Sequence, residues 1–286
     1  MAPRVVGIGE LLWDVFPGGR RLGGAPANFA SHCARLGCRG AVVSRVGDDA
    51  LGTQALAQLS ALGVEARLQI DPVLPTGTVT VAIGPGGQPS YTIHEGVAWD
   101  ALEDPGAAQA DAICFGTLAS RDPRSRGAIQ RFLDAAAPTC LRVFDVNLRQ
   151  TFHTPERVRA LLGRCDVLKL NEDELPVVAA MAGVPAVPQA LRARFGLRLV
   201  ALTLGARGSI LCTARDRREE PGVPVEVVDS VGAGDAFTAA LVTGLLQGLD
   251  LATLHRRATA LAAFVCTREG ATPDTRAFLA TSPAFL

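Results

Sequence analysis

Short apolar runs alternate along this chain with segments in which apolar residues recur every three or four positions. The runs end near small or polar residues, as buried strands do. Because strands and helices alternate, we expect an α/β fold with a mostly parallel central sheet and helices on both faces. The expected strands are Arg4–Gly9, Ala41–Arg45, Ala112–Phe115, Arg142–Asp145, Val167–Leu170, Leu199–Leu204 and Ser209–Cys212. The expected helices are Ala27–Leu36, Leu51–Leu62, Arg124–Ala137, Pro155–Leu162, Glu172–Met181 and Pro188–Arg194.

Two segments interrupt this alternation and are typical of β-hairpins. One contains the turn Pro17-Gly18-Gly19, and the other places Gly84-Pro85-Gly86-Gly87 between two strand-like runs. We therefore expect a small β-strand lid formed by about 12–22 and 74–96, which could cover a ligand; surface decoration is the alternative. No long linker is present, so 1–286 is expected to form a single domain. Exposed lid edges make a homodimer through the lid reasonable.

The composition favours a protein that binds small ligands. The chain has 286 residues, of which 48% are hydrophobic, enough for a large core. Its 28 basic and 28 acidic residues cancel, so no nucleic-acid or membrane partner is expected. The cysteines form no Cys-x-x-Cys pair, and the N-terminus has no basic and apolar leader. These features predict reduced core cysteines and a cytoplasmic location.

Three common nucleotide-binding motifs are missing. The only lysine, Lys169, follows Leu168 rather than a glycine, which excludes a P-loop, and no other lysine remains for a protein-kinase type of site. The opening Gly7-Ile8-Gly9 has Leu12 in place of the third glycine of the dinucleotide fingerprint. A redox enzyme of that type is therefore disfavoured, and any ATP must bind in another way.

The segment Asp229-Ser230-Val231-Gly232-Ala233-Gly234-Asp235 combines a carboxylate with small residues at the start of a helical pattern. Glycine and alanine leave backbone N–H groups open to an anion, at the positive end of the helix. Asp235 then lies in the first helical turn, where it could act as a base beside an anion hole. The alternative is a tight turn with an ordinary first-turn acid.

Three further groups of polar residues follow expected strands or precede expected helices. Gly23-Gly24-Ala25-Pro26-Ala27-Asn28 precedes a helix, and Asp14 lies nearby, which suits a ligand with many hydroxyl groups. Arg149 and the run Asn171-Glu172-Asp173-Glu174 each follow a strand, so they are expected to face one crevice. Arg149 could hold a phosphate, and Asn171 and Glu174 offer oxygen ligands for Mg²⁺. Ordinary helix caps and turn residues are the alternatives, and a capped helix at Asn171 is compatible with both roles.

Together, the segments 23–28, 171–174 and 229–235 resemble those of the ribokinase/PfkB family of carbohydrate kinases, over nearly the whole chain. Within that family, Gly9-Glu10-Leu11-Leu12-Trp13-Asp14, Ala25-Pro26-Ala27 and Glu95-Gly96-Val97-Ala98-Trp99-Asp100 are most similar to bacterial fructokinases. The resemblance implies a ribokinase-like three-layer sandwich and an ATP-dependent kinase that uses Mg²⁺ and phosphorylates a small sugar.

The resemblance also implies a role for each matching residue. Asp235 is the expected base, the amides of Gly232, Ala233, Gly234 and Asp235 form the anion hole, and Arg149 bridges sugar and phosphate. The expected sugar contacts are Asp14, Gly24, Asn28, Trp99 and Arg149. Expected ATP and Mg²⁺ contacts are Asn171, Glu174, Thr203, Gly205, Gly208 and Gly234. A monovalent cation such as K⁺ is expected near Asp229, Val231, Val265, Arg268, Gly270 and Asp274, mostly through backbone carbonyls.

Ser230 departs from the family pattern, in which threonine is commoner, but it keeps the hydroxyl group. Rival functions are a family kinase for ribose, 2-keto-3-deoxygluconate, a nucleoside or a sugar phosphate, and a non-catalytic sugar or nucleotide sensor. A phosphorylated acceptor would need cations near the lid, for which Arg20 and Arg21 are candidates. A sensor should have lost the base or the anion hole, and both are present.

Overall fold

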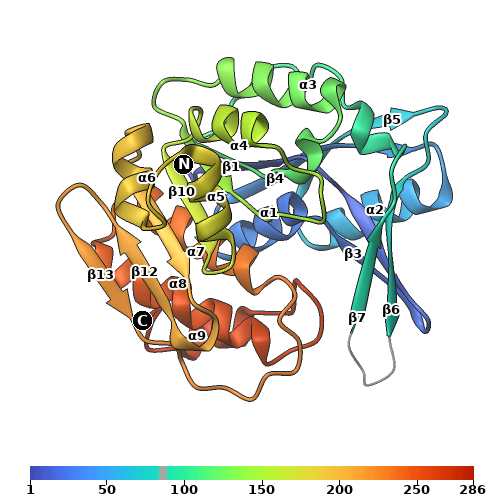
Figure 1. Cartoon of the computed structure of the whole chain (residues 1–286). Coiled ribbons are helices and arrows are strands. Elements are labelled where there is room, and N and C mark those ends of the chain that lie inside the picture. Colours follow the sequence, from blue (N-terminus) through green and yellow to red (C-terminus); the bar gives the residue numbers. More distant parts are fainter. Residues whose placement is uncertain (84–88) are drawn as a thin grey trace.

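A mostly parallel sheet forms the centre of the computed structural model, which describes residues 1–83 and 89–286 (Figure 1). Within these residues the sheet has nine strands in the order β13-β12-β11-β10-β9-β8-β1-β4-β5. Strands β5 to β11 in this order run parallel, and β12 and β13 are antiparallel additions at one edge. The strands are β1 Arg4–Ile8, β4 Arg39–Gly47, β5 Glu65–Asp71, β8 Ala112–Phe115, β9 Leu141–Asp145, β10 Val167–Asn171, β11 Leu199–Thr203, β12 Ser209–Cys212 and β13 Arg217–Glu220.

Helices cover both faces of this sheet because its central strands are apolar on both sides. In β11, Val200 packs with α3 to α6 on one face, whereas the next residue, Ala201, packs with α1, α7 and α8 on the other. The described helices include none that is long and apolar enough to span a membrane. The α-helices are α1 Ala25–Arg35, α2 Ala50–Ala61, α3 Pro123–Asp134, α4 Pro155–Leu162, α5 Glu174–Ala182, α6 Pro188–Phe195, α7 Ala233–Leu246, α8 Leu251–Cys266 and α9 Arg276–Thr281. Short 3₁₀ helices occupy Ala98–Ala101, Leu118–Ser120 and Gly205–Arg207.

A second, smaller sheet projects from the main one as the expected β-strand lid (Figure 1). It contains β2 Leu12–Phe16, β3 Gly19–Gly23, β6 Gly77–Ile83 and β7 Pro89–Ile93, in the order β3-β2-β6-β7. Each expected hairpin is an antiparallel pair, and a parallel pairing of β2 with β6 joins them. The turn expected at Gly84–Gly87 lies outside the described residues. The single-domain assignment and the dimer through the lid stay predictions.

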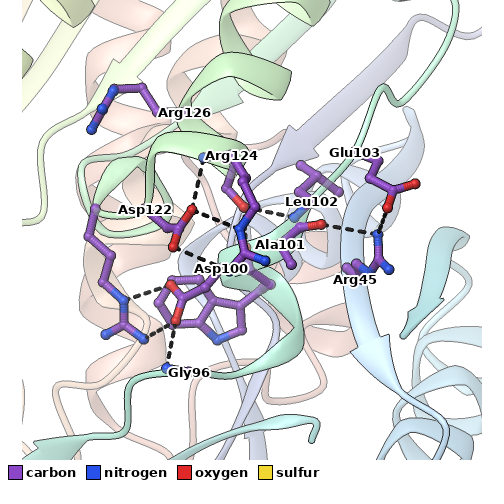
Figure 2. Close-up of polar contacts among 12 residues, drawn as sticks. Arg45, Gly96, Asp100, Ala101, Leu102, Glu103, Asp122, Arg124 and Arg126 are labelled. Atoms are coloured by element: carbon purple, nitrogen blue, oxygen red, sulfur yellow. Dashed lines mark hydrogen bonds and ion pairs between the residues drawn. The ribbon is translucent and has the colours of Figure 1, made fainter. Parts of the chain in front are cut away.

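A buried ion pair fixes the base of the lid to the main sheet. The Arg121 guanidinium donates to both carboxylate oxygens of Asp100, at 2.8 Å each, and to the His94 carbonyl just beyond β7, at 2.6 Å. Its central carbon lies 4.0 Å from the ring centroid of Trp99 and 4.6 Å from that of Phe152. Asp100 also accepts a hydrogen bond from the Gly96 N–H at 3.1 Å (Figure 2). One guanidinium therefore holds the lid strand and the core together.

Replacing Arg121 tests this anchor. In Arg121→Met the Asp100 carboxylate stays buried without its cation, so we expect the free energy of unfolding to fall by about 3–5 kcal/mol in urea denaturation. The neighbouring Arg124→Met is the matched control. Arg124 also pairs with an aspartate, Asp122 (Figure 2), but its side chain is 61% exposed, so this pair contributes little. Equal unfolding midpoints for the two variants would contradict the assignment.

Candidate active site

A cavity of about 1110 Å³ lies where the carboxyl ends of the central strands meet the lid. The start of α1, the loop after β9, the end of β10 and the start of α7 all contribute to its wall. Most of the residues expected to form the site line it. These are Asp14, Gly24, Asn28, Arg149, Asn171, Thr203, Gly205, Gly208, Asp229, Val231, Gly232, Ala233, Gly234, Asp235 and Gly270.

Asp235 lies in the first turn of α7 and is only 9% exposed. Its Oδ2 accepts a hydrogen bond from Asn28 Nδ2 at 2.8 Å, although the two residues are 207 positions apart. Burial and the nearby Asp145 carboxylate together raise the pKa of Asp235 to about 7, against the opposing effects of Asn28, Lys169 and Arg149. A carboxyl group with a pKa near neutrality can accept a proton from an alcohol in a reaction at pH 7.

Unpaired backbone donors lie beside this carboxyl group, at the N-terminus of α7. Among the described residues, the N–H groups of Gly232, Gly234 and Asp235 have no hydrogen-bond partner, while that of Ala233 donates to the Ser230 carbonyl at 3.3 Å. Gly232 has φ 79°, and a Cβ there would lie 2.5 Å from the Ala271 backbone, so only glycine fits. Since the positive end of the helix dipole adds to these donors, the loop can bind an anion.

Lys169 belongs to the same site, although the sequence analysis used it only to exclude a P-loop. It lies on β10 and is 4% exposed, and its Nζ is 3.1 Å from Oδ1 of Asp145, its direct neighbour on β9. The other oxygen of Asp145 accepts a hydrogen bond from the Thr238 hydroxyl at 2.8 Å. The sequence could have indicated this role. Side chains alternate between the two faces of a strand, so Lys169 lies on the same side of β10 as Asn171.

Glu10 is a second residue whose role the sequence analysis missed. It lies two residues beyond β1, lines the cavity and is only 5% exposed, and its Oε2 has no hydrogen-bond partner among the described residues. Burial raises its pKa to about 7, against the opposing effects of backbone N–H groups and of Arg149 and Arg121. A buried oxygen without a partner is unfavourable, so this one is suited to a ligand hydroxyl group.

Asp14 and Arg149 face the cavity from the lid and from the loop after β9. Burial raises the pKa of Asp14 to about 6, while Arg149 lowers it and Asp229 adds to the rise. Arg149 is exposed and forms no ion pair with a described residue. Its loop is held by left-handed backbone at Asn147, with φ 46°, and at Gln150, with φ 45°. Arg149 is therefore a cation available to a ligand.

Two expected contacts lie behind the cavity wall. Both carboxylate oxygens of Glu174 accept backbone hydrogen bonds, from Leu148 N–H and Asn171 N–H at 2.9 Å each. Asn171 Oδ1 in turn accepts from Glu174 N–H at 2.8 Å, so the pair forms a capping box at the start of α5. Trp99 is 1% exposed and packs against Arg121, and it does not line the cavity. Direct ligand contact by Glu174 or Trp99 is therefore not supported, because their polar atoms or rings are used within the fold.

Of the six residues expected near a monovalent cation, three line the cavity and three do not. Asp229 accepts hydrogen bonds from Val231 N–H and Gly270 N–H, both at 3.0 Å, so these three lie together at the cavity. The remaining three do not line it. The Val265 carbonyl accepts from Arg268 N–H, the Arg268 side chain is exposed, and the exposed Asp274 pairs with Arg276. The cavity wall thus brings three of the six together, and a cation site made by all six stays a prediction.

The end of the cavity away from the lid is more apolar. Thr203, Gly205 and Gly208 line it after β11, together with Val223, Val225 and Val227. These valines are between 37% and 63% exposed, which is unusual for a residue of this type. A flat apolar group such as a nucleotide base would cover them.

Comparisons with known proteins agree with this geometry. Residues 9–277 match the family described as pfkB family carbohydrate kinase. A putative sugar kinase of Pyrococcus horikoshii is 32% identical over 87% of this chain and 82% of its own, and its structure in complex with ATP has a TM-score of 0.86 over 98% of both chains. A fructokinase of Escherichia coli is 30% identical over 86% of this chain and 85% of its own. A Vibrio cholerae O395 fructokinase with bound fructose, ADP and calcium is 26% identical, with a TM-score of 0.84 and 98% coverage of both chains.

The match covers most of the chain, and the fold agrees with the ribokinase-like architecture of these solved structures. The expected three-layer sandwich is confirmed, and a kinase is the enzyme class. The chain belongs to the PfkB family of carbohydrate kinases.

Proposed function

We propose that this kinase transfers the γ-phosphate of ATP to a primary hydroxyl group of a small uncharged sugar, with fructose as the first candidate. The observation that supports it best is the buried Asp235 carboxyl group, placed beside the N–H groups of Gly232 and Gly234, which have no partner in the described part of the chain. A base and an anion site in contact are what phosphoryl transfer to an alcohol requires.

Asp235 acts as general base in this proposal. It takes the proton of the attacking hydroxyl group while the new O–P bond forms and the bond to the β-phosphate oxygen breaks, releasing ADP. The hydrogen bond from Asn28 fixes one carboxylate oxygen, so the other is directed at the acceptor. The N–H groups at the start of α7 stabilise the charge on the phosphoryl oxygens, and Arg149 contacts sugar and phosphate from the opposite wall.

The proposed acceptor site is rich in hydrogen-bonding groups. Among the described cations that line the cavity, Arg149 alone has no ion pair, and the transferring phosphoryl group uses it. Glu10, Asp14 and Asn28 line it with oxygen and amide atoms suited to hydroxyl groups. Arg21 on the lid is already paired with Asp229 at 3.4 Å and Glu269 at 2.9 Å, and Arg20 donates to Gln54. These pairs disfavour a phosphorylated acceptor. The E. coli and V. cholerae relatives named as fructokinases favour fructose among neutral sugars.

ATP is proposed to place its base against the valines at the far end of the cavity, near Thr203, Gly205 and Gly208. Mg²⁺ would neutralise oxygens of the β- and γ-phosphates. The described residues contain no cluster of three or more acids, histidines or cysteines able to hold a metal, and Glu174 is occupied by backbone N–H groups. Mg²⁺ would therefore be held by the phosphates and water, with Asn171 at the nearest wall. A role for K⁺ at Asp229, Val231 and Gly270 stays a prediction.

A substrate panel tests the proposal. ADP formation is measured with fructose, ribose, 2-keto-3-deoxygluconate, mannose and adenosine, with and without K⁺. We expect the highest kcat/KM with fructose. Asp235→Asn should lose about 10²–10⁴-fold in kcat, because the base is removed, yet bind ATP as the original does in calorimetry. Full turnover in Asp235→Asn would show that Asp235 is not the base. A higher kcat/KM with another sugar would show that fructose is not the preferred substrate.

The pH dependence should report the state of Asp235. Its carboxylate form is the base, and its pKa is raised to about 7, so log kcat/KM should rise with pH up to about 7 and then level off. Glu10 titrates in the same range, which makes Glu10→Gln the matched control. In Glu10→Gln, log kcat/KM should still rise with pH, whereas the residual activity of Asp235→Asn should not rise with pH. Loss of the rise in Glu10→Gln alone would assign it to Glu10.

Asp14→Ala should affect the KM for the sugar and the KM for ATP differently. If Asp14 binds sugar hydroxyl groups, the variant should raise the KM for the sugar by roughly tenfold or more and change the KM for ATP little, since sugar hydroxyl groups are left without a partner. Asp216→Ala is the control, because Asp216 is exposed at the turn between β12 and β13 and does not line the cavity. Equal effects of Asp14→Ala on both KM values would argue against a sugar contact.

A further inference from the structure

Lys169 lies directly against the loop that carries the unpaired N–H groups. Its Nζ is 2.8 Å from the position that a Cβ on Gly234 would occupy, so a side chain at position 234 would collide with the ammonium group. Lys169 and Gly234 both line the cavity. The ammonium group therefore occupies the floor of the anion site, although it comes from the sheet and not from α7.

The ammonium group has donors to spare. It carries three N–H bonds, and among the described residues it donates to one acceptor, Asp145 Oδ1 at 3.1 Å. Asp145 itself is fully engaged, because its other oxygen accepts from Thr238. A buried ammonium group needs further partners, and the open side of Lys169 is the cavity. Anionic oxygens of a ligand bound at the Gly232–Asp235 loop would supply them.

The charge of Lys169 persists in this environment. Burial alone would lower its pKa, but the carboxylates of Asp145, Glu174 and Asp235 outweigh burial and raise it. Lys169 is also the only lysine among 28 basic residues, so arginine is the common cation everywhere else in the chain. The compact ammonium group lies beneath Gly234, where the absence of a side chain leaves room for it.

We propose that Lys169 is a catalytic residue whose ammonium group contacts the transferring phosphoryl group and stabilises its charge together with the N–H groups of Gly232 and Gly234. The inference rests on the proposed function of this cavity. Lys169 keeps its proton throughout: the acceptor hydroxyl proton goes to Asp235, the O–P bond to the acceptor forms, and the bond to the β-phosphate oxygen breaks with release of ADP. Lys169 acts only through its fixed charge, which is stronger in a buried site than in water.

The rival role is structural, in which Lys169 merely neutralises the buried Asp145. Thr238→Val is the matched control, because it removes the other hydrogen bond to Asp145 and leaves the cation in place. Lys169→Met removes the charge at similar length. Since that variant leaves Asp145 buried without its cation, Lys169→Met/Asp145→Asn removes both charges and keeps the comparison valid if the single variant does not fold.

Two measurements separate the roles. The first is turnover with the best sugar of the panel, where we expect kcat to fall about 10²–10³-fold in the Lys169 variants and much less in Thr238→Val. The second is calorimetry with MgADP alone and with MgADP plus aluminium fluoride, which mimics the transferring phosphoryl group. The Lys169 variants should bind MgADP within about threefold of the original chain and lose most of the extra affinity given by aluminium fluoride.

The proposal is overturned if the folded double variant keeps its kcat or its response to aluminium fluoride, or if Thr238→Val loses as much of both as the Lys169 variants do. A different result would contradict the proposed sugar kinase activity, namely that the unaltered chain phosphorylates none of the sugars. The aluminium fluoride comparison needs no acceptor and still decides the role of Lys169 in that case.

Discussion

The hydrogen bond between Asn28 and Asp235 depends on the close approach of two helices that start far apart in the sequence. Helix α1 can approach because Gly7 on β1 has no side chain, as a Cβ there would lie 2.2 Å from the Pro26 carbonyl oxygen. Phe29 and Cys33 on α1 then pack in one core cluster with Ala236 to Val242 of α7. Packing of apolar faces therefore fixes the distance between the carboxyl group and its amide partner, and thereby the direction of the base.

The electrostatics of the cavity reduce the stability of the fold. Burial raises the pKa values of Glu10, Asp14 and Asp235 from 4.5, 3.8 and 3.8 to about 7, 6 and 7. The folded chain thus retains protons that the unfolded chain has released, so these groups lower the free energy of unfolding as pH rises from about 4 to 7. Groups that weaken a fold and line this cavity are better explained by ligand binding than by packing.

The sequence predicted the central strands well and both edges of the sheet poorly. Strands buried on both faces are continuous apolar runs, which are easily recognised. The two missed strands, β5 and β13, are the outermost ones. In β13 the sequence Arg217-Arg218-Glu219-Glu220 is entirely charged, because an edge strand is exposed and charges there prevent pairing with other chains. Periodicity of apolar residues cannot identify such a strand.

The site was predictable as far as local motifs define it. The Gly232–Asp235 segment is a loop and a helix start in one stretch, so its chemistry could be inferred from neighbours in sequence. Glu174 shows the limit, because the same Asn and Glu pair suits a metal or a capping box, and only the position of the Leu148 N–H decides between them. Lys169, in contrast, belongs to no local motif. Its position in the site depends on the register of β9 against β10 and on the absence of a side chain at Gly234, which are contacts between distant parts of the sequence.

Asp229 connects the anion site to the lid. Its carboxylate accepts from Val231 and Gly270 in the main body and from Arg21 on the lid strand β3, the last at 3.4 Å. The first two bonds are local and fix the loop that leads into α7. The third is long and joins partly exposed side chains, so it is weak. Its loss would leave intact the two bonds that fix the anion loop.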